Sequence, residues 1–260
     1  DTTMLNNGNF IGLENYRDLL HDELFWRSLK NTLYYTAAYV VIGSVLAIGL
    51  ALLLNRNVSG QGAYRSIIYL PTIVPLVAAS VVWIYILHPA YGPLNYQLSR
   101  VGLPTPGWFS DPQWAMPGLI LIGLWGIGNV VIIYLAGLQS VPTDLKDSAR
   151  VDGANGWQVF RGVTFPMLAP AFTIVTITTF IAMFRAFDIP YVLGGPGGAP
   201  DGTTDVLSLV IYREAFGLGG IVGSVYRQGY AVAAGVVMFV FLIVAVSIQA
   251  IFLRRREVAL

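Results

Sequence analysis

The sequence Asp147-Ser148-Ala149-Arg150-Val151-Asp152-Gly153 lies within a polar segment, residues 140–166, between two long apolar runs. The first run covers residues 115–139, and the second, residues 167–184, begins directly after Val163-Thr164-Phe165-Pro166. Neither run contains a charged residue. A chain that crosses a bilayer has little reason to build an ordered polar loop of this size unless a partner docks on it. The stretch therefore predicts a docking loop between two membrane spans.

The composition places the whole chain in a membrane. Of its 260 residues, 55% are hydrophobic and only 11% are charged, whereas soluble domains carry about 25% charged residues. Five runs without Asp, Glu, Lys, Arg or His in their interior could cross a ~30 Å hydrocarbon core, which takes ~20 helical residues. They are Asn31–Leu54, Ser66–Leu87, Ala115–Gln139, Met167–Phe184 and Tyr230–Leu253. The sequence therefore predicts an all-α polytopic membrane protein with five transmembrane helices.

The distribution of charge predicts the orientation. If the segment after the first run faces the cytoplasm, the inner segments carry more basic than acidic residues and the outer segments the reverse. Basic excess marks the cytoplasmic side of short loops. Arg254-Arg255-Arg256, directly after the last run, is the clearest basic cluster. We expect the 140–166 loop and the C-terminus to be cytoplasmic, in a multi-pass protein without a nucleic-acid partner.

Residues 1–30 form a different kind of segment. Leu13, Tyr16, Leu20 and Leu24 recur at helical spacing with charged residues between them. This pattern is typical of an amphipathic helix at the membrane interface. We divide the chain into this outer interfacial segment and a transmembrane domain over residues 31–260, and the absence of cysteine excludes disulfides and thiolate chemistry.

The docking loop resembles the cytoplasmic signature of binding-protein-dependent ABC-transporter permeases, of the type I importer fold. That signature reads Glu-Ala-Ala, three residues, Gly, nine residues, Ile-x-Leu-Pro. Here Asp147-Ser148-Ala149, Gly153 and Val163-Thr164-Phe165-Pro166 keep its register without a gap. Phe187-Asp188 and Gly194-Gly195-Pro196 match a second family motif, although two residues before its glycines are missing. The family usually has six spans, so we expect this chain to lack the first.

The resemblance implies a function, a location and partners. It points to the carbohydrate branch, the permeases of the maltose, lactose and glycerol-3-phosphate type, in the bacterial cytoplasmic (inner) membrane. It implies a second homologous permease subunit, two copies of an ATP-binding subunit and an extracytoplasmic substrate-binding protein. ATP and Mg would be bound by the ATPase partner, and no cofactor by this subunit.

The docking loop has local signals for two short helices. Thr143 is a candidate N-cap, Asp144 suits a helix N-terminus and Gly153 can end the helix. A second helix over Asn155–Gly162 would carry Trp157 and Phe160 on one side. The alternative is a solvated loop with accidental capping signals. The resemblance assigns ATPase coupling to five residues of the loop: Asp147, Ser148, Ala149, Asp152 and Gly153.

A candidate substrate path comes from polar and aromatic residues within the runs. Trp125 and Asn129 are spaced i, i+4 in the third run, and Thr179, Met183 and Phe187 follow one face of the fourth. Aromatic faces and isolated polar groups suit sugars, but helix packing uses the same residues.

No residue pattern indicates catalysis or a metal site, so we predict a permease subunit and no enzyme. The rival functions are an ion-coupled secondary carrier and a membrane-embedded enzyme. Both are disfavoured because ion carriers keep charged residues within their spans, and these runs have none.

Overall fold

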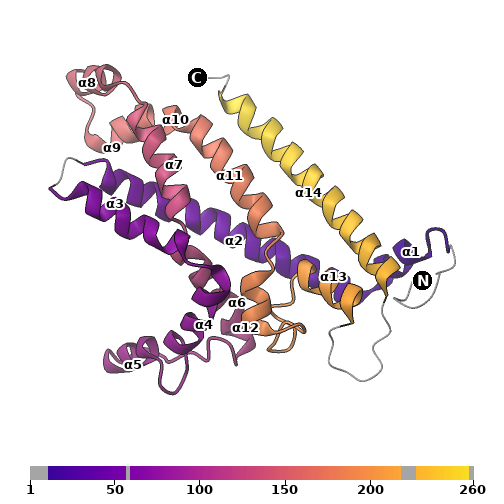
Figure 1. Ribbon diagram of the computed structural model, residues 1–260. Coiled ribbons are helices and arrows are strands. Elements are labelled where there is room, and N and C mark those ends of the chain that lie inside the picture. Colours follow the sequence, from indigo (N-terminus) through magenta and orange to yellow (C-terminus); the bar gives the residue numbers. More distant parts are fainter. Residues whose placement is uncertain (1–10, 57–58, 218–226, 258–260) are drawn as a thin grey trace. The chain divides into compact units, whose positions relative to one another are not determined.

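The computed structural model describes residues 11–56, 59–217 and 227–257, with side chains up to residue 252. Within these ranges the ordered elements are all helical (Figure 1). The first and last residues of the chain, including the side chains of Arg254-Arg255-Arg256 and the start of the predicted interfacial segment, lie outside the described residues. The predicted all-α class is confirmed.

Three helices are long and apolar enough to cross a membrane by themselves. They are α2 (Glu23–Leu54), the run Ala169–Gly194 that contains α11 (Ala169–Phe184) and α12 (Asp188–Gly194), and α14 (Gln228–Glu257). Two further spans are broken helix pairs. One joins α3 (Gln61–Tyr69) and the 3₁₀ turn η1 (Leu70–Ile73) to α4 (Leu76–Ile86), and the other joins α6 (Pro112–Trp125) to α7 (Gly128–Gln139). The described chain thus has up to five spans if each bent pair counts as one.

The two breaks correct the expected continuous spans Ser66–Leu87 and Ala115–Gln139. The first break has a local cause, because Pro75 cannot donate a backbone hydrogen bond and stands in an extended conformation before α4, with φ −56° and ψ 129°. At the second, α6 ends at Trp125 and α7 starts at Gly128. A Cβ on Gly128 would lie only 2.5 Å from the Ile68 carbonyl oxygen, so glycine permits the close approach of α7 to the first broken pair.

The chain divides into two compact units. Unit 1 comprises residues 1–37, 74–123 and 182–243, and unit 2 comprises residues 38–73, 124–181 and 244–260. Each of the five spans contributes residues to both units.

Unit 1 contains four short helices that lie before, between or at the end of the long span helices. They are α1 (Glu14–His21), α5 (Pro93–Arg100), α12 and α13 (Leu207–Phe216). Helix α12 packs on α4 (Figure 1). Asp22 separates α1 from α2, and its side-chain Oδ1 accepts a hydrogen bond from the Leu24 backbone N–H at 2.8 Å, which caps the start of the long helix.

Unit 2 contains the segment between α7 and α11. This segment folds into α8 (Thr143–Val151), α9 (Gly156–Val159), the π-helical turn η2 (Phe160–Thr164) and α10 (Phe165–Met167). Glycine permits α7 to pack closely on the start of α11, because a Cβ on Gly137 would lie 3.0 Å from side-chain atoms of both Ala171 and Leu168.

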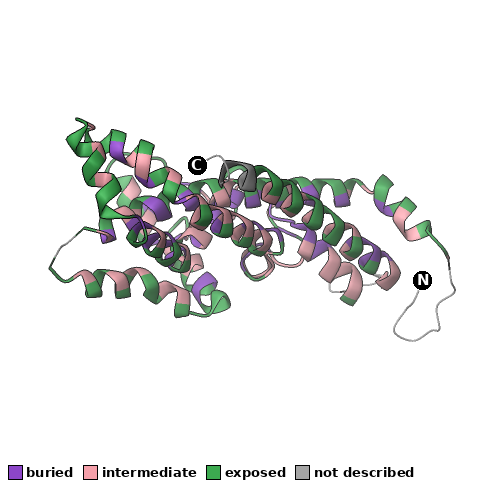
Figure 2. Cartoon of the chain, turned by 90° about the horizontal axis from the view of Figure 1, so that it is seen from above, coloured by how far each residue is buried: buried purple, intermediate pink, exposed green. Residues whose placement is uncertain are grey.

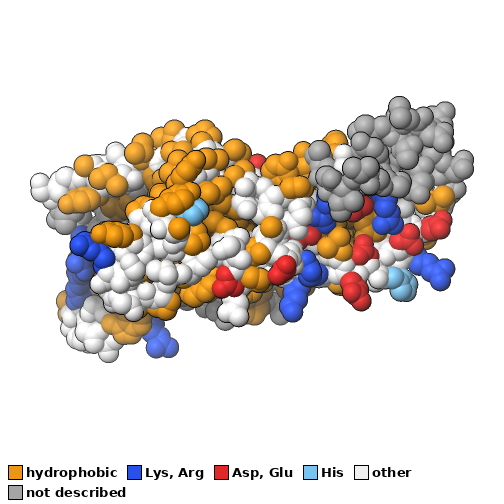
Figure 3. Space-filling view, turned by 90° about the horizontal axis from the view of Figure 1, so that it is seen from below, with side chains coloured by type: hydrophobic (Ala, Val, Ile, Leu, Met, Phe, Trp, Pro, Cys, Tyr) orange, Lys and Arg blue, Asp and Glu red, His pale blue; other side chains and the backbone are white. Residues whose placement is uncertain are grey.

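The spans leave much of their apolar surface uncovered. Among the three continuous spans α14 is the least buried, and exposed and intermediate residues dominate along it (Figure 2). On the face drawn in Figure 3, apolar side chains form broad patches, and most of the acidic side chains lie in the right half of the view. Such a surface matches a lipid environment.

Candidate coupling loop and substrate path

The first helix of the docking loop, α8, begins without a side-chain cap. Pro142 is the N-cap residue and Thr143 is the first helical residue, with no capping hydrogen bond from a side chain. The prediction that Thr143 caps the helix is therefore wrong, because proline fixes the backbone before the helix and shifts the boundary by one residue. Asp144 lies in the first turn as predicted, where its negative charge interacts favourably with the positive end of the helix dipole.

The end of α8 is set by Gly153. Its φ is +87°, in the left-handed region that L-residues rarely adopt. Its N–H donates to the Arg150 carbonyl at 3.0 Å, and the Ala154 N–H donates to the Ala149 carbonyl at 3.0 Å. This pair of bonds closes the helix in a Schellman motif. The predicted helix end at Gly153 is confirmed.

The second helix of the loop is shorter than expected. Instead of running over Asn155–Gly162, α9 ends at Val159 and the chain continues as the π-helical turn η2. Asn155 and Gln158 form a reciprocal capping box, with hydrogen bonds of 2.7 and 3.0 Å between their side chains and backbone N–H groups. The rings of Trp157 and Phe160 lie together as predicted, with centroids 5.5 Å apart.

The loop presents an accessible surface that mixes charge with apolar side chains. The Arg150 guanidinium donates to Asp147 Oδ1 at 2.8 Å, and both side chains are about two-thirds exposed. Ser148, Asp152 and Gly153 are also exposed, and Ala149 is half-buried. Four large apolar residues of the loop are open to the surface: Leu145 (46% exposed), Val151 (88%), Trp157 (67%) and Phe165 (45%). The loop is doubly capped, by the Schellman motif at the end of α8 and the capping box at the start of α9. Such a rigid loop with exposed apolar side chains is suited to receive a protein partner.

The predicted substrate-path residues fall in different units. Trp125, Asn129 and Thr179 belong to unit 2, and Met183 and Phe187 to unit 1. Trp125 and Asn129 do not share a continuous helix, since the break between α6 and α7 lies between them. Asn129 is nonetheless exposed, and Thr179 is half-buried. Whether either contacts substrate stays a prediction.

Phe187 does not continue the face of α11 that carries Thr179 and Met183. The helix ends at Phe184, and Phe187 has φ −130° at the N-cap of α12. Its ring instead stacks on Tyr191 at a centroid distance of 5.1 Å and meets Tyr212 edge-on at 4.9 Å. Tyr212 in turn contacts Phe216 at 5.1 Å. Within unit 1, Phe187 is therefore part of an aromatic cluster that joins α12 and α13.

Sequence analysis missed a buried polar cluster in unit 1. Arg213 pairs with Asp205 at 3.1 Å, and the Asp205 side chain is only 1% exposed. Burial raises the pKa of Asp205, although the Arg213 guanidinium opposes the shift. The Asn31 amide donates to the Asp205 carbonyl at 3.1 Å, and the Thr32 hydroxyl accepts from the Leu207 N–H at 2.8 Å. These bonds fix the loop before α13 to the start of α2. No local sequence pattern predicts these hydrogen bonds, because they join residues far apart in the sequence.

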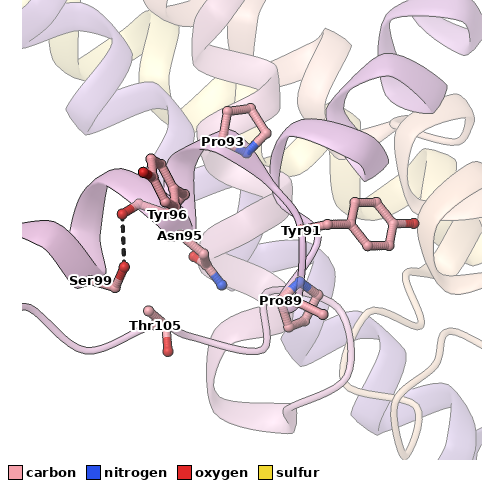
Figure 4. Close-up of a pocket in the computed structure, with 8 residues that line it drawn as sticks. Pro89, Tyr91, Pro93, Asn95, Tyr96, Ser99 and Thr105 are labelled. Carbon is pink, nitrogen blue, oxygen red and sulfur yellow. Dashed lines mark hydrogen bonds between the residues drawn. The ribbon is translucent and has the colours of Figure 1, made fainter.

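The segment before α6 lines an open pocket of about 460 Å³ (Figure 4). Asn95 is buried, donates to the Pro106 carbonyl at 2.9 Å and accepts from Trp108 Nε1 at 2.8 Å. In Figure 4 the Ser99 hydroxyl donates to the Tyr96 carbonyl, at 2.8 Å. The polar groups of Asn95 and Ser99 are thus engaged within the segment, and we assign the pocket to the folding of this connection.

Comparisons with known proteins place the chain. Residues 40–258 match the family model described as "Binding-protein-dependent transport system inner membrane component". A probable starch degradation products transport permease of Thermoanaerobacterium thermosulfurigenes is 34% identical over 99% of this chain and 85% of its own length. The sulfoquinovosyl glycerol transport permease of Agrobacterium fabrum is 33% identical over 94% of this chain and 76% of its own length.

A solved structure has the same fold. A chain of a bacterial ABC transporter that imports the acidic polysaccharide alginate superposes with a TM-score of 0.82 and 31% identity, over 95% of this chain and 84% of that one. A second structure of the alginate transporter contains a periplasmic protein bound to an alginate pentasaccharide, and it superposes equally well. The matched family model covers most of the chain, so this protein belongs to the inner-membrane components of binding-protein-dependent transport systems and is an ABC-transporter permease subunit, not an enzyme.

Proposed function

We propose that this chain forms half of the translocation pathway of an ATP-driven importer for a sugar or sugar-like solute, and that it couples to ATPase subunits through residues 143–163. The observation that carries the proposal is the exposed, doubly capped pair of helices α8 and α9 between two spans.

The geometry of the loop supports a coupling role. Helix α8 ends in a Schellman motif and α9 starts in a capping box, so one end of the short connection 152–155 is held by backbone hydrogen bonds and the other by bonds between side chains and backbone N–H groups. A rigid connection transmits force, whereas a flexible one absorbs it. Asp147 already accepts a hydrogen bond from Arg150, and its exposed carboxylate can also accept one from a partner. Asp147, Ser148, Ala149, Asp152 and Gly153 form the proposed contact.

The orientation and the partners follow from this role. The 140–166 loop and the C-terminus face the cytoplasm, where two copies of an ATP-binding subunit bind ATP and Mg and dock on the loop. A second homologous permease completes the pathway, and an extracytoplasmic binding protein delivers the solute. Spans from the two permeases then rock around a site near mid-membrane, as alternating access requires. The basic residues that flank the inner ends of the spans support this sidedness.

The solute class is supported by the relatives. Those reported above are named for starch degradation products, sulfoquinovosyl glycerol and alginate, all of them saccharides or sugar glycosides. Trp125, Asn129, Thr179, Met183 and Phe187 are the proposed residues of the path. An ion-coupled carrier and a membrane enzyme remain disfavoured, because the family couples transport to a binding protein.

The test is transport by the reconstituted complex with its ATPase, second permease and loaded binding protein. Asn129→Ala and Thr179→Val should each slow solute uptake while basal ATP hydrolysis and assembly persist. Thr178→Val is the matched control, because the neighbouring Thr178 hydroxyl bonds its own helix at the Ile174 carbonyl, 2.7 Å away. Unchanged uptake in both test variants, or loss only through disassembly, would refute a path at these residues. Absence of uptake of any saccharide by the unaltered complex would refute the solute class.

A further inference from the structure

Arg185 lies between two neighbouring cavities of unit 1. The chain leaves α11 at Phe184, and Arg185 is the next residue, with an exposed side chain. One cavity, of about 350 Å³, lies toward α13, and the other, of about 390 Å³, lies toward α14. Apart from Arg185, the lining is apolar or aromatic except for Ser208 and the Tyr212 hydroxyl.

The position of these cavities along α14 sets their depth. Arg185 lines them together with Met238 and Leu242. At 1.5 Å per residue, those two residues lie about 15 and 21 Å from the start of the helix at Gln228. The candidate span covers Gln228–Phe252, so both flank its midpoint. Arg185 directly follows the fourth apolar run of the sequence, Met167–Phe184, whereas the structure places it beside the centre of α14. A charged residue at that depth faces a partner, a water-filled cavity or a functional ligand.

Most of the other arginines of unit 1 have side-chain contacts that Arg185 lacks, Arg17 on α1 being the exception. Four of them are engaged: Arg27 with the Asp201 carbonyl, Arg100 with the Tyr96 ring, Arg213 with Asp205, and Arg227 with Asp18 and the Tyr230 ring. In the part of the chain that the structure describes, Arg185 forms no hydrogen bond or ion pair. No carboxylate lines either cavity, and Asp188, one turn further on, does not pair with it.

We propose that Arg185 and these two cavities form an oxyanion-binding site. The ligand is a phosphate, sulfonate or carboxylate group attached to an apolar chain or a sugar ring. A guanidinium presents its donors in a planar fork that matches such groups, and charge-assisted hydrogen bonds are stronger where water is sparse. Phe187 and Tyr212 line the same cavity and supply ring surface for the body of the ligand.

Two sources can supply this chemistry. One is the headgroup phosphate of a bilayer lipid, which would have to be drawn from the interface to this depth along the exposed face of α14. The other is an acidic group on the transported solute, and this source alone rests on the proposed function. Both require the same unpaired guanidinium, so one measurement on Arg185 tests the site and separate ligands identify the source.

The experiment is residue-resolved labelling of arginine by phenylglyoxal. The assembled complex is held in micelles of a polyoxyethylene detergent, which contains neither phosphate nor sugar, and modification is followed by peptide mass spectrometry. Inorganic sulfate, trigalacturonate and phosphatidylglycerol are added in separate arms, with maltotriose as the neutral control. An oxyanion should slow modification of Arg185 by roughly threefold or more. Arg17, which is exposed on α1 and lines neither cavity, should react at an unchanged rate.

The arms separate the outcomes. Protection by trigalacturonate at lower concentration than by phosphatidylglycerol assigns the site to the solute, and the reverse order assigns it to lipid. In the Arg185→Lys variant, the introduced side chain is labelled with an amine reagent in the presence of the same anions. If these anions slow its modification, the positive charge is the recognised feature. The inference is overturned if no anion protects, if maltotriose protects equally, or if Arg185 is unreactive without any ligand because a partner covers it. Uptake of saccharide by the same complex is measured separately, so failure of the proposed function is distinguishable from failure of the site.

Discussion

Replacing Gly153 with valine should uncouple ATP hydrolysis from transport without unfolding the protein. The cause is local, because Gly153 has φ +87° and no atom lies within 4 Å of the position that a Cβ would take. The Cβ of valine therefore enters open space. The cost of the substitution arises from the left-handed backbone, which a β-branched residue tolerates poorly.

The magnitude follows from that backbone penalty. An L-residue in the left-handed region costs about 1–2 kcal/mol, and a β-branched residue lies at the upper end of that range. The Schellman bonds from Gly153 and Ala154 to α8 would open to relieve it. A penalty of this size shifts the equilibrium between the capped and the opened loop by a factor of about 5–30. If only the capped loop docks productively, apparent coupling falls by the same factor.

The assay is ATP hydrolysis stimulated by the loaded binding protein, measured beside uptake in proteoliposomes. Gly156→Val is the matched control, since its Cβ would also enter open space but its φ is not positive. Gly153→Asn should restore much of the coupling, because asparagine tolerates the left-handed region. Equal stimulation in the Gly153→Val and Gly156→Val complexes would show that the capped geometry is not what the ATPase recognises.

Three further changes test the rest of the structure. Asp147→Lys should weaken coupling by reversing the exposed charge and removing the ion pair with Arg150, as measured by the ratio of ATP hydrolysed to solute imported, while insertion stays normal. Cysteines placed at the exposed Ser59 and Ser110 should react with an impermeant thiol reagent from opposite sides of the membrane, and labelling from one side only would contradict the topology. Asp205→Ala should destabilise unit 1 by about 3–5 kcal/mol, because it leaves the Arg213 guanidinium with no counter-ion in a buried site, and proteolysis of residues 195–206 reports this. The pKa of Asp205 is raised in the folded protein, so the contribution of this carboxyl group to the free energy of unfolding is greatest at acidic pH and declines as pH rises through that pKa. The Asp205→Asn variant should lack this dependence of stability on pH.

The sequence predicted what depends on neighbouring residues. The apolar runs predicted the helices, because a span must satisfy its own backbone hydrogen bonds in lipid. Gly153 predicted the end of α8, because the left-handed cap is made within one turn. The boundary at Thr143 was wrong by one residue, because both Pro142 and Thr143 are compatible with the start of a helix and only the three-dimensional backbone decides between them.

The breaks within the second and third spans required contacts that no periodicity records. Pro75 signals a kink, but a membrane helix can also absorb a proline by bonding its freed carbonyls elsewhere. At Gly128 the decisive fact is the approach of the Ile68 carbonyl, which would stand 2.5 Å from a Cβ. Because this contact joins two spans, it exists only after they have packed, and the i, i+4 relation drawn between Trp125 and Asn129 was lost with the continuity of the helix.

The same distinction explains why the coupling loop could be read in more detail than the substrate path. The loop is defined by caps and turns whose hydrogen-bonding partners lie within five residues of one another. A short stretch of sequence therefore contains all the residues that determine its structure. A substrate path is defined by side chains from several spans that face one cavity, and helical spacing assigns a side chain to a face without saying what that face meets. Phe187 shows the consequence: its spacing from Met183 suggested one continuous face, but α11 ends at Phe184 and the ring turns into the cluster with Tyr212. Arg185 lies at the same helix end, so the turn that removes Phe187 from the predicted face is also the feature that leaves a cation beside the middle of α14.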